Sequence, residues 1–255
     1  MNKIKLPKIF KPKFETELIR LGDRKDGGYL IPVKSILNTK KLISFGLADN
    51  FSFEEDFYKK NKVEIFCFDK SVNFKFFLKP FLFGNFKKLF QYIKYRTFFD
   101  GKNKHHIKKN IIPKGTYKSD LYDINENIED INSILSRHYS ENIFFKIDIE
   151  GSEYRILDQL IKFSSSMTGL VIEFHDCDLN FDKIKNFIEH FELQIVHIHV
   201  NNWDYISKDF FPRCIEFTFS PPKFNKKSTD ENKKYPTILD VPNNQTFKDL
   251  PIEFI

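Results

Sequence analysis

The segment KIDIEGSE, from Lys146 to Glu153, ends an apolar run and leads into a turn. With the residues before it, the run is IFFKIDIE, in which Lys146, Asp148 and Glu150 alternate with isoleucines. Side chains alternate between the two faces of a strand, so these three are expected to share one face of a strand over 143–150. A strand of a parallel sheet covered on both faces is normally apolar throughout. Polar groups near its carboxyl end therefore indicate a function.

Two later runs have polar side chains at their carboxyl ends in the same way. The run LVIEFH aligns Glu173 and His175, and IVHIHVN aligns His197, His199 and Asn201. Open α/β sheets bind ligands outside the carboxyl ends of their strands, where these groups would converge. A single strand histidine is often an ordinary hydrogen-bonded residue, but burying the whole set for structure alone is costly. The convergence of the three strand ends is the main functional signal.

The alternation of short β-rich runs with helical patterns predicts an α/β fold with a mostly parallel sheet. Six strands are expected, at Leu42–Leu47, Val63–Asp69, Ile143–Glu150, Leu170–His175, Gln194–Asn201 and Cys214–Phe219. Apolar residues spaced three and four apart predict amphipathic helices at Phe51–Asn61, Glu126–Tyr139, Glu153–Phe163 and Phe181–Phe191.

The end of the first predicted strand, SFGLADNFSFEEDF, suits a nucleoside. Ser44, Gly46 and Asp49 lie in a turn before a helix, and a glycine there lets the backbone approach a ligand. Asp69 ends the next strand about twenty residues later, the spacing at which an acid meets ribose hydroxyls. The full GxGxxG motif is missing, which disfavours a bound pyrophosphate. Upstream, DGGY at 26–29 forms a turn that either closes over a ligand or is a simple loop.

Composition limits the class of protein. The 255 residues include 41% apolar and 30% charged residues, as in a folded globular chain. The 31 phenylalanines indicate either an AT-rich genome or selection, and the net charge of +6 favours an anionic ligand only weakly. The three cysteines are far apart and are expected to be buried thiols. Without a signal peptide or a spanning run, the sequence predicts a cytoplasmic protein, with peripheral membrane contact left open.

KIDIEGSEYRIL, over 146–157, resembles the FkbM-type methyltransferases, which are class I enzymes dependent on S-adenosylmethionine. The resemblance extends to SFGLADNFSFEEDF, to DGGY and to VIEFH at 171–175. It implies one methyltransferase domain over 1–255, with a Rossmann-like sheet of seven strands. The last strand, over 214–219, would be antiparallel, which brings Glu216 close to the same crevice. The family's third strand is hard to place and is assigned to 107–112.

The resemblance also implies site residues. Contacts to the cofactor would come from Gly46 and Asp69, with Asp49 and Asp148 nearby. Ser44, Gly28 and Tyr29 complete the candidate cofactor-binding set.

Methyl transfer to a hydroxyl requires a base or a metal ion. His175 is the first candidate base, because a neutral imidazole is available near neutral pH. A divalent ion, Mg or Mn, held by Asp148, Glu173 and Glu150 is the alternative, and His197 or His199 would complete a site for a transition metal. Both schemes stay open, and the candidate catalytic set is His175, Asp148, Glu173 and His199.

Two segments fall outside the alternation. The segment 72–110 combines ten Lys or Arg residues with one acid and many aromatic residues, and it is predicted to be an inserted cap. It either favours an anionic acceptor, lies on an anionic membrane as an amphipathic helix, or is a solvated basic face. The tail over 221–255 is expected to wrap the surface or to be partly disordered.

By resemblance, the leading hypothesis is an O-methyltransferase for a saccharide or a nucleotide-linked or phosphorylated small molecule, in glycan or natural-product assembly. A nucleotide-dependent oxidoreductase and a non-catalytic nucleoside- or glycan-binding protein are the rivals. Nucleic-acid modification is a third option, because basic and aromatic residues coexist. Nucleic acid is nevertheless not expected as a partner, since no known RNA-binding motif accompanies them.

Overall fold

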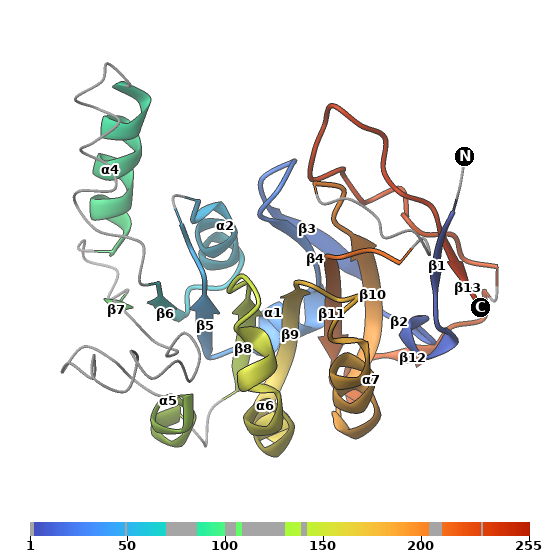
Figure 1. Cartoon of the computed structure of the whole chain (residues 1–255). Coiled ribbons are helices and arrows are strands. Elements are labelled where there is room, and N and C mark those ends of the chain that lie inside the picture. Colours follow the sequence, from blue (N-terminus) through green and yellow to red (C-terminus); the bar gives the residue numbers. More distant parts are fainter. Residues whose placement is uncertain are drawn as a thin grey trace, which may run out of the picture.

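A seven-stranded sheet forms the centre of the protein (Figure 1). The computed structural model describes residues 3–48, 50–69, 86–99, 106–108, 131–138, 142–203, 211–230 and 232–255. The strands are β5 (Lys41–Phe45), β6 (Glu64–Phe68), β7 (His106–Lys108), β8 (Ile143–Ile147), β9 (Met167–Phe174), β10 (Gln194–Val200) and β11 (Ile215–Ser220). Their order across the sheet is β10-β11-β9-β8-β5-β6-β7.

The direction of the strands confirms the expected fold class. The pairs β5·β6, β5·β8, β6·β7 and β8·β9 are parallel, whereas β11 is antiparallel to both β9 and β10. The strand over 214–219 is therefore the antiparallel one, as predicted. Strand β7 lies at the edge beyond β6 and overlaps the start of 107–112, where the third family strand was assigned. The sheet therefore has the mostly parallel arrangement, with an antiparallel last strand, that the resemblance implies.

The strand predicted over 143–150 is too long. Strand β8 ends at Ile147 rather than at Glu150, because the chain turns there and Glu150 and Gly151 have positive φ of 54° and 89°. Asp148 and Glu150 therefore lie in the loop after the strand and not in the strand itself. This loop still directs both side chains towards the carboxyl edge of the sheet.

Helices cover both faces of the sheet. Alternate residues of a strand face opposite sides of the sheet. On one side, Ile43 belongs to the cluster with α5 (Ile131–His138), α6 (Leu157–Phe163) and α7 (Phe181–His190). On the other side, Leu42 belongs to the cluster with α1 (Val33–Asn38) and α2 (Ser52–Lys60). Short 3-10 helices occur at η1 (Lys8–Phe10), η3 (Glu153–Arg155), η4 (Ser164–Ser166) and η5 (Pro222–Phe224). The helices predicted from the sequence all exist in the described part, although residues 126–130 lie outside it and the segment from 153 begins as η3.

The segment 72–110 is only partly described. Because β6 and β7 are parallel neighbours, the chain between them must cross over, and α4 (Phe86–Phe99) belongs to this connection. Phe98 and Phe99 are buried against Phe51, so α4 packs beside α2. Of the helices in the described ranges, none is long and apolar enough to cross a membrane.

A hairpin and the two chain ends flank the sheet. Strands β3 (Leu18–Gly22) and β4 (Gly28–Pro32) form an antiparallel hairpin on the α2 side. Strand β1 (Ile4–Leu6) pairs in parallel with β13 (Ile252–Phe254), so the two ends of the chain lie side by side (Figure 1). A second short pair joins β2 (Phe14–Glu15) to β12 (Lys226–Lys227).

The tail over 221–255 is more closely integrated than expected. His197 Nε2 lies 2.8 Å from Asp240 Oδ1, and His199 Nε2 lies 2.9 Å from Asp249 Oδ1. These two pairs attach the tail to β10, and Asn243 and Asn244 of the tail are buried. The two histidines, which were predicted to face the crevice, hold the tail instead.

We expect the His197–Asp240 pair to make stability depend on pH. Burial alone would raise the pKa of Asp240, but the charge and hydrogen bond of His197 hold it at about 2. A lowered folded-state pKa gives stability that is complete above the unfolded value near 4 and is lost as the pH falls towards 2. Asp240→Asn should remove about 2.5 kcal/mol at pH 6 and about half of this at pH 3.

Urea unfolding of both proteins at the two pH values measures this difference. Asp178→Asn, at an exposed position, is the control and should change stability little at either pH. An equal loss for Asp240→Asn at pH 6 and pH 3 would contradict the role assigned to the pair.

Candidate functional site

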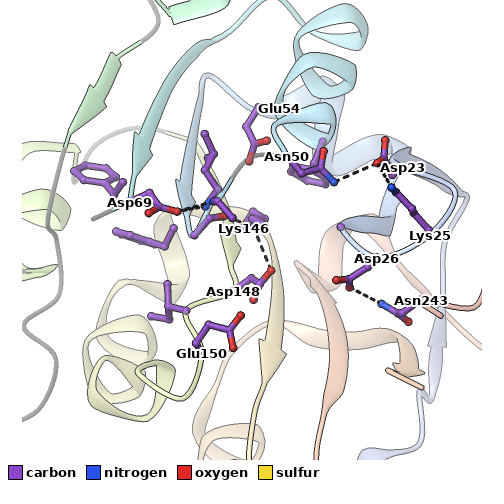
Figure 2. Close-up of a pocket in the computed structure, with 18 of the residues that line it drawn as sticks. Asp23, Lys25, Asp26, Asn50, Glu54, Asp69, Lys146, Asp148, Glu150 and Asn243 are labelled. Carbon is purple, nitrogen blue, oxygen red and sulfur yellow. Dashed lines mark hydrogen bonds and ion pairs between the residues drawn. The ribbon is translucent and has the colours of Figure 1, made fainter. Parts of the chain in front are cut away.

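A cavity of about 630 Å³ opens at the carboxyl ends of β5, β6 and β8 (Figure 2). It is closed by the β3–β4 turn, by α2, by Gln91 of α4, by Trp203 after β10 and by Asn243 of the tail. Six carboxylate side chains line it, namely Asp23, Asp26, Glu54, Asp69, Asp148 and Glu150, against two lysines, Lys25 and Lys146. The cavity therefore favours a ligand that carries positive charge.

The turn after β5 is built by Gly46 and Asp69. Gly46 has φ of 82°, and a Cβ placed on it would lie 1.6 Å from the backbone oxygen of Asp148. Asp69 Oδ2 accepts hydrogen bonds from the backbone N–H of Leu47 at 2.6 Å and of Ala48 at 2.7 Å. Gly46, Leu47, Ala48, Asp69 and Asp148 all line the cavity. The role of Gly46 and Asp69 in binding a cofactor stays a prediction.

Lys146 connects the loops after β5 and β8. Its ammonium group donates to the backbone oxygen of Gly46 and lies 3.6 Å from Asp148 Oδ2. Burial alone would lower the pKa of Lys146, but Asp148, Glu54 and Glu173 raise it, so the side chain is a cation. This buried cation balances part of the acidic wall.

A second, smaller cavity of about 220 Å³ adjoins the first. Both cavities share Asp26, Asp148, Glu150 and Trp203, and the smaller one adds Glu173, His175, Asn201 and Cys214. The three predicted strand ends therefore do meet, through Asp148, Glu173 with His175, and Asn201. The two compartments can hold two ligands side by side.

Tyr29 lies beneath the junction of the two cavities. Its hydroxyl is 3.1 Å from Asp148 Oδ2 and 3.1 Å from Glu173 Oε2. Burial raises the pKa of Tyr29 well above its usual value, so the hydroxyl stays protonated. Glu173 also accepts hydrogen bonds from Asn201 Nδ2 and Cys214 Sγ at Oε1, both at 2.8 Å. Tyr29 was predicted to contact the cofactor, but it holds two carboxylates of the site.

His175 is surrounded by carboxylates. Its Nδ1 lies 2.9 Å from Glu153 Oε1, and its Nε2 lies 3.7 Å from Glu150 and 3.9 Å from both Asp148 and Glu173. Burial alone would lower the pKa of His175, but its hydrogen bond to Glu153 and the neighbouring negative charges raise it to about 10. This raised pKa favours the protonated ring near neutral pH and so disfavours the neutral imidazole that was expected there.

Glu173, in contrast to His175, is suited to accept a proton near neutral pH. Burial, followed by the charges of Asp148 and Glu216, raises its pKa to about 8. A carboxylate with such a pKa is a better proton acceptor near neutral pH than an ordinary one. The proton-accepting role assigned to His175 thus fits Glu173 better.

Three other predicted residues lie elsewhere. His199 has Glu216 at 3.1 Å on Nδ1 and Asp249 on Nε2, and it lines neither cavity. Ser44 is fully buried and bonds Glu54. Gly28 faces Asp23 and Arg20 of the hairpin, and its neighbour Gly27 lines the cavity instead. Asp49 lies outside the described residues.

Two groups of side chains have the spacing of metal ligands. Asp148, Glu150 and His175 form one group, and Glu173, His175 and Cys214 form the other, with ligand atoms within 4.8 Å of one another in each. The predicted trio of Asp148, Glu150 and Glu173 is divided between these groups. A metal ion bound by His175 requires a neutral imidazole nitrogen, so it would have to displace the proton on Nε2.

Sequence reasoning missed Glu54, Trp203 and Asn243. Glu54 precedes Phe57 by three positions, a spacing that places it on the apolar side of α2 and could have indicated a buried acid. Asn243 Nδ2 donates to Glu216 Oε1 at 2.7 Å and Asp26 Oδ1 at 3.1 Å (Figure 2), and no periodic pattern in the tail indicates this contact.

Comparisons with known proteins give only distant likenesses. No family model matches the sequence, and no curated protein is significantly similar to it. A fibrillarin in a fibrillarin/Nop5p complex is 10% identical with a TM-score of 0.33, over 86% of this chain and 100% of its own. TYW2 of M. jannaschii, solved with AdoMet, is 10% identical with a TM-score of 0.33, over 80% and 88%.

The methyltransferase domain of a bacterial CtHen1 is 12% identical with a TM-score of 0.36, over 72% of this chain and 91% of its own. Likenesses this distant do not transfer a function, so the site itself must support one. The resemblance to the FkbM-type enzymes remains a prediction.

Proposed function

We propose that the protein is a methyltransferase that uses S-adenosylmethionine and methylates a hydroxyl group of a small molecule. The observation that supports this most is the two-part acidic cavity at the carboxyl edge of a class I methyltransferase sheet. The cofactor would occupy the larger part, and the acceptor would occupy the smaller part, with Asp148 at the boundary.

The charge of the larger cavity supports this cofactor. S-adenosylmethionine carries a sulfonium and an ammonium group against a single carboxylate and is a net cation, whereas a dinucleotide carries an anionic pyrophosphate. Six carboxylates against two lysines favour the binding of S-adenosylmethionine and disfavour the binding of a dinucleotide. Lys25 lies 3.9 Å from Asp23, and Lys146 lies near Asp148, so neither lysine is an isolated phosphate-binding group. This charge disfavours the nucleotide-dependent oxidoreductase.

The cavity also has the form that the cofactor requires. Its volume lies within the usual range for small-molecule sites. The turn at Gly46 brings backbone close to the cavity, and Asp69 stands at the end of β6, where ribose hydroxyls would be bound. When bound, the cofactor supplies a methyl group activated by the positive sulfur. The protein has to hold the acceptor in line with it and remove the hydroxyl proton.

Proton removal can follow either of two schemes. In the first, Glu173 or Asp148 accepts the hydroxyl proton, while the His175 cation keeps the other carboxylates close together. In the second, Asp148, Glu150 and His175 would hold a divalent ion, which would lower the pKa of the hydroxyl.

Removal of metal ions distinguishes the two schemes. If the carboxylate scheme holds, dialysis against a chelator leaves the rate of methyl transfer unchanged. If the metal scheme holds, the rate falls at least tenfold and returns on adding Mg²⁺ or Mn²⁺, and mass spectrometry of the native protein detects the bound ion.

The acceptor is proposed to be a saccharide. Asp26, Asp148 and Glu150 beside the exposed indole of Trp203 suit a neutral polyol, whose hydroxyls donate to carboxylates while its C–H face packs on the ring. An anionic acceptor, as the net charge suggested, would need a metal ion or basic residues of 72–110. Membrane contact by that segment and a role in glycan assembly remain proposals from the sequence.

Trp203 provides a direct test of the cofactor. It is the single tryptophan of the chain, its side chain is 61% exposed, and it borders both cavities. We expect S-adenosylhomocysteine to change its fluorescence in a saturable way and NAD to have no effect. The Trp203→Phe variant should still bind S-adenosylhomocysteine when binding is measured by calorimetry. The same variant should show no change in fluorescence.

Binding of NAD alone would refute the proposal. Binding of S-adenosylhomocysteine without transfer of a labelled methyl group to any of a panel of nucleotide sugars and simple saccharides would favour the non-catalytic binding protein.

A further inference from the structure

Glu54 is a buried acid at the inner end of the larger cavity. It lies in the first turn of α2, its exposed fraction is 1%, and it lines the cavity (Figure 2). Ser44 Oγ donates a hydrogen bond to Glu54 Oε1 at 2.5 Å. Within the described chain, the other oxygen, Oε2, is buried and has no hydrogen-bond partner.

An unpaired carboxylate oxygen in such a place is unfavourable. Burial raises the pKa of Glu54, and the charge of Lys146 offsets this only in part. The ammonium group of Lys146 is already directed to the Gly46 backbone oxygen and to Asp148, and it forms no ion pair with Glu54 among the described residues. A buried polar atom costs free energy until a partner is supplied. No described residue supplies one to Oε2, and the cavity that Glu54 lines is where a ligand could do so.

We propose that Glu54 Oε2 binds the ammonium group of the amino acid portion of the cofactor. This inference rests on the proposed function, because it assigns one end of the same ligand. A charged donor fits better than a hydroxyl, since a desolvated carboxylate forms its strongest hydrogen bonds with cations. The ribose is expected at Asp69, which directly follows β6 and is not part of α2. Ser44 is then a positioning residue that fixes the Glu54 carboxylate.

Calorimetry with three ligands tests this assignment: S-adenosylhomocysteine, its analogue without the amino group, and 5′-methylthioadenosine. Wild-type protein should bind S-adenosylhomocysteine at least tenfold more tightly than the desamino analogue. Glu54→Gln keeps the shape of the side chain. This variant should bind S-adenosylhomocysteine about 10- to 100-fold more weakly than the wild type does. Its affinity for the desamino analogue and for 5′-methylthioadenosine should stay within about twofold.

Glu55→Gln is the matched control, because Glu55 is the next residue of α2 but pairs with Lys94 outside the cavity. It should leave the affinities for all three ligands unchanged. Ser44→Ala keeps the carboxylate and should reduce the preference for the amino group by a smaller factor. This second variant tests the proposal independently if Glu54→Gln does not fold.

Two results would show that Glu54 is a structural acid and overturn the assignment. One is that Glu54→Gln weakens the binding of all three ligands equally. The other is that Ser44→Ala leaves the preference for the amino group unchanged. If the wild-type protein binds none of the three ligands, the proposed function fails, and this assignment fails with it. The two failures are therefore distinguishable in the same experiment.

Discussion

Gly46→Ala is expected to lower the free energy of unfolding by about 3 to 5 kcal/mol and to abolish cofactor binding. Two costs add up at this position. Alanine at φ of 82° is strained, and its Cβ would overlap the Asp148 backbone oxygen at 1.6 Å. Relief requires the loops after β5 and β8 to separate, and both loops line the larger cavity. Urea unfolding and S-adenosylhomocysteine titration measure the two effects.

Gly151→Ala separates the two costs. Gly151 has a similar φ of 89°, but the nearest atom to its added Cβ would be Asp176 Oδ2 at 3.9 Å. This variant should lose only about 1 to 2 kcal/mol, the cost of the left-handed backbone. Equal losses in the two variants would mean that the contact between Gly46 and the Asp148 backbone is not important.

The sequence was sufficient to predict six of the seven strands because each of the six had a clear apolar pattern, whereas β7 was placed only through the family resemblance. Placing β11 as the antiparallel strand came from the family resemblance, since periodicity alone gives no direction. The end of β8 was misplaced because the alternation of Lys146, Asp148 and Glu150 continues through the turn. Alternation of residue types does not show where the backbone leaves the extended conformation.

The site was harder to predict than the sheet. Convergence of strand ends correctly brought Asp148, Glu173 and His175 together. It failed for His199, because the sequence cannot show that a tail acid fifty positions away occupies its ring nitrogen. It also could not show that several carboxylates surround the His175 ring and raise its pKa, because those contacts form only in the fold.

Glu173→Gln is expected to reduce the rate of methyl transfer by about a thousandfold, with little change in the affinity for S-adenosylhomocysteine. Glu173 borders only the smaller cavity, so its loss should affect the acceptor side. The amide is isosteric with the carboxylate but cannot take the hydroxyl proton. Single-turnover transfer of a labelled methyl group gives the rate, and calorimetry gives the affinity. A rate within fivefold of wild type would exclude Glu173 as the base.

Glu216→Gln is the matched variant for this prediction. Glu216 is the cross-strand partner of Glu173 on β11 and is equally buried, but it binds His199 and Asn243 and lines neither cavity. It should cost stability without lowering the maximal rate more than a few-fold.

The pH profile of the same variant is more informative. The Glu216 charge helps to raise the pKa of Glu173 to about 8, behind burial and Asp148. A base works in its deprotonated form, so the wild-type rate should rise with pH up to about 8, and Glu216→Gln should move this rise to lower pH. A metal ion on Glu173 would keep it deprotonated across this range. An unshifted profile together with loss of activity on chelation would therefore favour the metal scheme.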